Sequence, residues 1–148
     1  MKVFKRILHA TDFSKASRPA LAKAIALAHQ NRAPLLIAHV LVPLVIRVGD
    51  GFVSPGAYDA INHGTREDAH KQLVSLVQHA KKAGAHATAL LLGGAPHEQV
   101  VRAARRNRVD LIVLGTHGRT GLSRVLVGSV AERVIRFAAC PVLTVRSR

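Results

Sequence analysis

The chain has few aromatic residues. Its 148 residues include no tryptophan, one tyrosine and four phenylalanines, although 49% of the sequence is hydrophobic. The core must therefore be built mainly from Val, Leu, Ile and Ala, a composition expected of parallel strands that helices cover on both faces. A chain of this length can bury a sizeable core in one unit, so we expect a single domain over residues 1–148.

Cysteine and long apolar runs are also scarce. The single cysteine, Cys140, excludes an internal disulfide, and together with the scattered histidines it matches no zinc-ligand pattern. No apolar run approaches the roughly 20 residues that a membrane-spanning helix needs. The opening MKVFKRILHATD lacks the apolar region of a signal peptide. These absences predict a cytoplasmic protein.

Acidic residues are outnumbered by basic ones. Eight Asp and Glu stand against 22 Lys and Arg, which gives a net charge of +14, and such a surface attracts anions, nucleotide phosphates and nucleic acids alike. The densest basic group has the spacing of a helix's outer face, which favours a solvated face over a binding stripe. It consists of Arg102, Arg105, Arg106 and Arg108.

Apolar runs and helical spacings alternate along the chain. Strands are predicted over residues 6–10, 35–40, 86–92, 110–114 and 142–145, and helices are predicted to begin near Pro19, Thr65, Pro96 and Ser129. This order predicts an α/β fold, with an open, mostly parallel five-stranded sheet and helices on both faces, as in Rossmann-like proteins. Proline and glycine between residues 41 and 64 predict a long loop.

Residues 115–129 follow the predicted fourth strand and carry the clearest chemical signal. They contain Gly115, Gly118 and Gly128-Ser129, spaced as Gly-x2-Gly-x9-Gly-Ser. Glycines let backbone N–H groups converge on an anion, and the helix that begins at Ser129 directs its free N–H groups and positive dipole end to the same place. A turn that merely joins a strand to a helix is the simpler alternative, but the strand before and the helix after the segment favour a phosphate-binding loop.

Two better-known phosphate loops are excluded. No Gly-Lys-Ser/Thr follows, so the segment is not a Walker loop, and no Gly-x-Gly-x-x-Gly follows the first strand. Arg119 and Arg124 could supply positive charge instead, or could be solvated loop residues.

The sequence resembles the universal stress protein family over essentially its whole length. The likeness is carried by RILHATDFS, by the strand ending His39-Val40, by LGTHGRTG with the glycine motif, and by VAERVIRFAACPVLTV. The resemblance implies an adenine-nucleotide-binding fold with five parallel strands. It also implies ATP binding, because members with the full glycine motif are the ATP binders, and a homodimer formed through the last strand.

The resemblance also implies which residues surround the nucleotide. Thr11 and Asp12 would lie beside it, with Asp12 toward the ribose or toward a nucleotide-bound Mg²⁺ or Mn²⁺, and the Val40 backbone would meet the adenine. The phosphates and ribose would be held by Gly115, Gly118, Gly128, Ser129 and Val130. From its place in the glycine motif rather than from the resemblance, Arg119 is a further candidate for contact with the phosphates. From the residues alone, Asp12 could instead cap the following helix, but its place at a strand end favours ligand contact.

Little in the sequence promises efficient catalysis. There is no nucleophile elbow, and Asp12 is the only carboxylate that can be placed at the pocket, so any ATP hydrolysis should be slow. His39 and His117 are expected to pack rather than to bind. The leading hypothesis is an ATP-binding regulatory stress protein that acts as a homodimer through Val142–Val145, whose strand would otherwise be an uncovered edge. The rival is a nucleic-acid-binding or polyanion-binding protein, against which the scarcity of stacking aromatics weighs.

Overall fold

The computed structural model describes residues 2–43, 55–116 and 127–147. Within them, five strands form one parallel sheet in the order β3-β2-β1-β4-β5. The strands are β1 (Ile7–Ala10), β2 (Leu35–Leu41), β3 (Ala87–Gly93), β4 (Leu111–Gly115) and β5 (Val142–Val145). The predicted α/β fold with a parallel five-stranded sheet is therefore confirmed.

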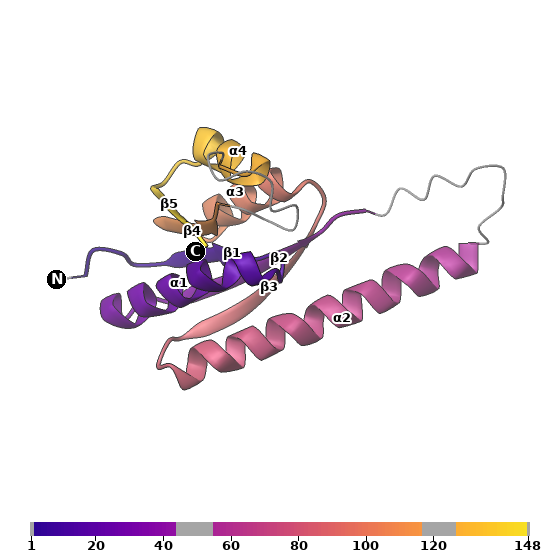
Figure 1. Ribbon diagram of the computed structural model, residues 1–148, viewed down its shortest axis with the longest axis horizontal. Helices are drawn as coiled ribbons and strands as arrows, with labels where there is room; N and C mark the ends of the chain where they lie inside the picture. Colours follow the sequence, from indigo (N-terminus) through magenta and orange to yellow (C-terminus); the bar gives the residue numbers. More distant parts are fainter. Residues whose placement is uncertain (1, 44–54, 117–126, 148) are drawn as a thin grey trace.

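Helices cover both faces of the sheet (Figure 1). α1 (Arg18–Asn31), preceded by a single 3-10 turn at Lys15–Ser17, and α2 (Pro55–Lys82) pack on one face; α3 (Pro96–Arg106) and α4 (Ser129–Phe137) pack on the other. Strand side chains alternate between the two faces. Ile7 thus joins the α1/α2 core while its neighbour Leu8 joins the α3/α4 core, which explains why the central strands are largely apolar, with His9 and His39 as the exceptions in β1 and β2.

The predicted loop over residues 41–64 is wrong in its second part, because α2 begins at Pro55. Gly56 and Gly64 therefore lie inside a helix, and Thr65 is no cap: its hydroxyl donates a hydrogen bond to the Ile61 carbonyl one turn earlier, at 2.9 Å. The rest of that loop, residues 44–54, lies outside the described residues.

The physical reason for this error is visible in the burial of α2. From residue 56 to residue 68 no described side chain is buried, and the first buried residue of the helix is Ala69. Figure 1 shows this first half of α2 extending beyond the sheet. Apolar periodicity arises only where a helix packs on a core, so the sequence pattern could reveal only the second half.

Candidate functional site

A cavity of about 620 Å³ opens at the C-terminal ends of β1, β2 and β4. β1 has β2 on one side and β4 on the other, so the order of the sheet reverses between β1 and β4. Ligands of open parallel sheets bind at such a reversal, beyond the carboxyl ends of the strands. The volume also lies within the range of small-molecule sites.

Most of the residues predicted for a nucleotide site line this cavity. They come from three strand ends and from the start of α4: Thr11, Asp12, Val40, Gly115, Gly128, Ser129 and Val130. Gly118 and Arg119, together with Arg124 and His117, lie outside the described residues. The structure thus brings together segments that are more than a hundred positions apart in the chain, as the parallel topology requires.

Thr11 organises the turn that follows β1. Its Oγ1 accepts a hydrogen bond from the Phe13 N–H at 3.0 Å and lies 3.1 Å from the Ser17 Oγ. The Ser17 hydroxyl donates to the Ser14 carbonyl at 2.8 Å, so it accepts the proton of Thr11. Ser17 does precede α1 as its N-cap residue, but without a side-chain capping bond. Ser17 therefore does not cap α1 with its side chain, because its hydroxyl is used to fix Thr11.

Asp12 forms a local turn at the edge of the cavity. Its Oδ1 accepts a hydrogen bond from the Ser14 N–H at 2.9 Å. This bond holds the carboxylate beside the strand end. Its contact with a ribose or a metal ion stays a prediction. No group of three or more His, Cys, Asp or Glu residues within the described ranges could hold a metal by itself.

His39, at the end of β2, connects the turn to the sheet. Its Nδ1–H donates to the Thr11 carbonyl at 2.8 Å, and its ring stacks on Phe13 with centroids 4.1 Å apart. The side chain is buried. Two contacts therefore fix the position of Thr11. The His39 ring bonds to the Thr11 carbonyl, and Ser17 bonds to the Thr11 hydroxyl.

α4 begins at the cavity wall. Gly128, its N-cap residue, donates its N–H to the Thr116 carbonyl, and its own carbonyl accepts the first helical bond from the Glu132 N–H at 2.9 Å. Gly128, Ser129 and Val130 all line the cavity, so the N-terminal end of the helix faces it. Free N–H groups and the positive end of a helix dipole favour an anion at this position.

Thr116 is a lining residue that the sequence analysis missed. Its side chain is 5% exposed, and its Oγ1 has no hydrogen-bond partner among the described residues. The backbone around it is held on both sides, since its N–H donates to the Val145 carbonyl at 3.1 Å. A buried hydroxyl without a partner is costly and calls for one. In the sequence, the position of Thr116 directly after Gly115, the first glycine of the motif, was the signal that it would line the cavity.

His9 lies within the sheet rather than in the cavity. It is fully buried on β1, its Nδ1 lies 3.0 Å from the Val113 carbonyl, and it is not among the described lining residues. Burial lowers the pKa of His9 to about 4, against the smaller raising effects of that carbonyl and of Asp12. The imidazole is therefore neutral near pH 7 and donates its Nδ1–H to Val113.

The cavity contains little that could activate a water molecule. Asp12 is the one carboxylate in its described lining, and part of its acceptor capacity is used by Ser14. Elsewhere in the described chain, no helix has the length and apolarity that crossing a lipid bilayer requires. The arrangement is suited to binding a ligand with both an apolar part and an anionic part.

The fold and the cavity together define a small doubly wound α/β protein with a cavity at its strand ends. The sequence pattern of the universal stress protein family matches residues 4–146. The chain belongs to this family.

Individual relatives agree with that assignment. Universal stress protein MJ0531 of Methanocaldococcus jannaschii is 36% identical over 97% of this chain and 83% of its own length. The solved structure of MJ0577, from the same organism, superimposes with a TM-score of 0.84 at 28% identity and covers 97% of this chain and 96% of that one. A universal stress protein solved in complex with cAMP has a TM-score of 0.72 at 25% identity, over 98% of both chains.

Proposed function

We propose that this chain is an ATP-binding regulatory protein of the stress response, in which the cavity beside β1, β2 and β4 holds the nucleotide. The observation that carries the proposal is the meeting of three features at one cavity: the N-terminal end of α4, the turn at Thr11 and Asp12, and the Thr116 hydroxyl, which has no partner among the described residues. The relative in complex with cAMP supports an adenine nucleotide as the ligand class.

The apolar part of the cavity suits the adenine. Val40, Leu41 and Val100 lie in its lining, and the backbone of Val40 continues β2 toward the opening. A base can stack against such aliphatic side chains while the backbone N–H and C=O groups at the strand end read its edge. We therefore assign the adenine to the β2 side.

The polar part suits the phosphates. Gly115 ends β4 and Thr116 follows it, while Gly128 and Ser129, where α4 begins, line the same opening next to Thr116. Thr116 and Ser129 can donate hydroxyl hydrogens to phosphate oxygens, and the helix end supplies backbone N–H groups. Gly118 and Arg119, which lie outside the described residues, would complete the phosphate-binding part of the site.

Asp12 would hold the ribose or a divalent cation bound to the phosphates. Mg²⁺ or Mn²⁺, when bound, neutralises phosphate charge, and both ions prefer carboxylate and phosphate oxygens. With a single carboxylate, the site depends on the nucleotide for most of its cation ligands. Any hydrolysis should accordingly be slow, and phosphate release measured against a protein-free control separates a slow ATPase from a pure binder.

The proposed assembly is a homodimer joined through β5. Among the described strands β5 pairs with β4 alone, so its outer edge has no strand partner. A second copy would cover this edge with backbone hydrogen bonds. Light scattering that gives the mass of one chain would contradict the dimer. With its single cysteine, the chain suits the reducing cytoplasm, where we place it.

Replacing Gly128 with leucine tests the proposal. Gly128 has φ −56°, a backbone conformation open to any residue, so the fold should persist while the new side chain fills the space beside Ser129. We expect Gly128→Leu to abolish ATP binding in calorimetry. Gly56→Leu is the matched control, because a Cβ there meets nothing within 4 Å. Unchanged affinity in a folded Gly128→Leu protein would refute the site.

A further inference from the structure

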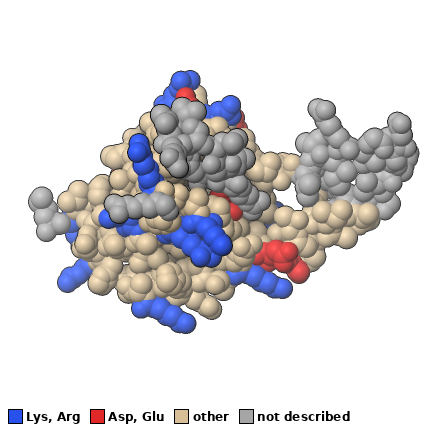
Figure 2. All heavy atoms as spheres, viewed as in Figure 1, with Lys and Arg blue, Asp and Glu red and all other residues tan. Residues whose placement is uncertain are grey.

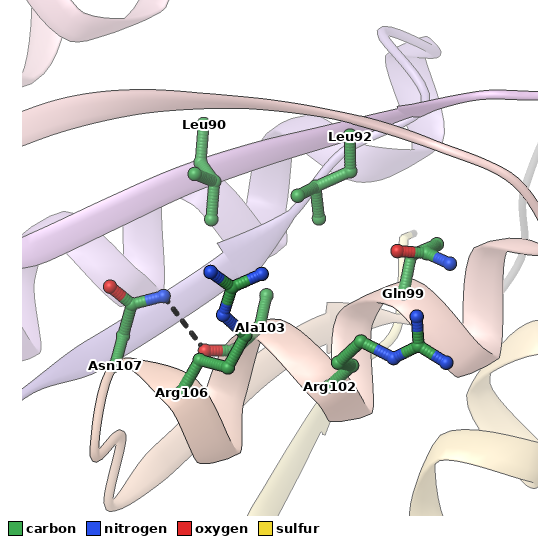
Figure 3. A pocket seen from close by; sticks show the side chains of 7 residues that line it. All are labelled: Leu90, Leu92, Gln99, Arg102, Ala103, Arg106 and Asn107. Atoms are coloured by element: carbon green, nitrogen blue, oxygen red, sulfur yellow. Dashed lines mark hydrogen bonds between the residues drawn. The ribbon is translucent and has the colours of Figure 1, made fainter.

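A second hollow lies on the α3 face of the sheet, away from the nucleotide cavity (Figure 3). It has a volume of about 310 Å³ and lies between β3 and α3. Leu90 and Leu92 point into it from the strand. The other side is lined by four residues of α3 and by the residue that follows the helix: Gln99, Arg102, Ala103, Arg106 and Asn107. We call it the α3–β3 groove.

The apolar floor of the groove results from the position of β3 at the edge of the sheet. β3 pairs with β2 alone among the described strands, with Leu90 opposite Ala38 and Leu92 opposite Val40. Leu90 and Leu92 pack against the α3/α4 core, yet both are only half-buried. The outer edge of β3 and these two side chains are therefore open to the same solvent space.

The wall of the groove is one face of α3. Gln99, Arg102 with Ala103, and Arg106 with Asn107 recur at the spacing that places side chains on one side of a helix. Asn107 is held in place, since its amide donates to the Ala103 carbonyl at 2.9 Å. In Figure 3 the guanidinium of Arg106 points toward β3. The sequence pattern identified this stretch as a solvated basic face, and the structure adds an apolar floor beside it.

The two arginines are not neutralised within the described parts of the chain. The ion pairs found there join His63 to Glu67, His97 to Glu98 and Arg136 to Glu132, and none includes Arg102 or Arg106. Both arginines are exposed. Two cationic heads beside an aliphatic floor complement a ligand that carries carboxylates on short aliphatic stems.

The spacing of the arginines matches an extended chain. Residues four apart on a helix are separated by about 6 Å along its axis. Residues two apart on a strand, which point to the same face, are separated by about 6.6 Å. A strand added along the free edge of β3 would thus place every second side chain toward α3, at the interval of Arg102 and Arg106.

We propose that the α3–β3 groove binds an extended acidic segment of a partner protein, which adds to the outer edge of β3 and places Asp or Glu side chains at alternate positions against Arg102 and Arg106. Backbone pairing with an edge strand supplies affinity, and the arginines supply selectivity for acidic residues. A single-stranded nucleic acid fits less well, because no aromatic side chain lines the groove for bases to stack on.

The test uses the full-length protein and a fluorescein-labelled peptide, Glu-Val-Glu-Thr-Glu-Val-Glu-Thr, whose glutamates share one face when it is extended. Fluorescence anisotropy should show saturable binding. A peptide of the same composition with its glutamates in one block should bind at least about tenfold more weakly, because it cannot place them at alternate positions. An oligo-dT of the same length is the nucleic-acid arm.

The variants separate the groove from general charge. Arg102→Gln with Arg106→Gln should weaken peptide binding by about tenfold or more, since both charge-assisted contacts are lost. Arg105→Gln with Arg133→Gln removes the same charge from exposed positions outside the groove and should change affinity less than about threefold. Absence of saturable peptide binding, equal loss in both double variants, equal binding of the block peptide, or tighter binding of oligo-dT in the groove would each overturn the proposal.

Discussion

The cavity at the ends of β1, β2 and β4 and the α3–β3 groove share one helix, since Pro96 and Val100 of α3 line the first and Gln99 and Ala103 line the second. Their construction differs. In the cavity, polar groups such as the Thr11 hydroxyl are buried and fixed by hydrogen bonds. In the groove, the polar groups include two exposed arginine heads at the edge of the sheet. Rigidity suits a small ligand of defined shape, whereas long cationic side chains suit a partner recognised mainly by charge.

Basic charge is also distributed in a way that separates the two sites. Figure 2 shows the Lys and Arg side chains of one face as separate groups rather than as a continuous stripe. The net charge of +14 can therefore draw anions to the surface in general without selecting among them. Selection must come from local geometry, which the cavity and the groove supply in different forms.

The largest expected effect is on the stability of the protein at low pH. It arises from His9, which is buried in the sheet next to the cavity. Its pKa falls from the ordinary 6.5 to about 4 on burial, so between these values the unfolded chain binds a proton that the folded chain does not. Stability is fully present above pH 6.5 and decreases as the pH falls toward 4, by about 3 kcal/mol in total.

Urea unfolding at a series of pH values measures this loss. His9→Gln retains a donor for the Val113 carbonyl but does not titrate in this range, so its stability should depend less steeply on pH. If both proteins lose the same stability between pH 6.5 and pH 4, His9 is not the source.

Thr11 should give the next largest effect. Thr11→Val leaves the Phe13 N–H without its acceptor and Ser17 without its donor, which should cost about 2 kcal/mol. Nucleotide affinity should fall as well, because Asp12 is positioned by the same turn. Thr11→Ser retains the hydroxyl and should restore most of both quantities in thermal unfolding and calorimetry. A failure of serine to rescue would show that the methyl group, not the hydroxyl, matters.

Thr116 should give a smaller effect of the opposite sign on stability. Its buried Oγ1 has no partner in the described part of the protein, so Thr116→Val should leave the nucleotide-free protein unchanged or more stable by up to about 1 kcal/mol. ATP affinity should nevertheless decrease, since the hydroxyl is assigned to the phosphates. A variant that is destabilised and binds ATP normally would show that the hydroxyl has a structural partner.

The sequence allowed prediction of much of this arrangement, and the failures have physical causes. All five strands were located to within one residue at each end, because each is a short, largely apolar run with turn residues at its ends. The convergence of Thr11, Val40 and Gly128 at one cavity followed from parallel topology together with the family resemblance. The first half of α2 was missed because none of its described residues is buried in the core, so no apolar pattern is imposed there.

Other features depend on contacts that no local pattern encodes. Ser17 has the residue type and position of a helix cap, yet its hydroxyl bonds to Thr11 and Ser14, which only the folded turn brings within reach. The α3–β3 groove was invisible for a similar reason. Arg102 and Arg106 have the spacing of an ordinary solvated face, and their neighbours Leu90 and Leu92 belong to a different element.

The smallest expected effect on stability concerns the α3–β3 groove. This prediction distinguishes the groove from the cavity most clearly. Arg102 and Arg106 are exposed and lack ion pairs in the described chain, so replacing both with glutamine should change the free energy of unfolding by less than about 0.5 kcal/mol. A substitution that leaves thermal unfolding and ATP affinity unchanged but removes peptide binding would show that α3 carries two separable sites. Lost ATP affinity in the same variant would mean instead that the groove and the cavity are coupled through α3.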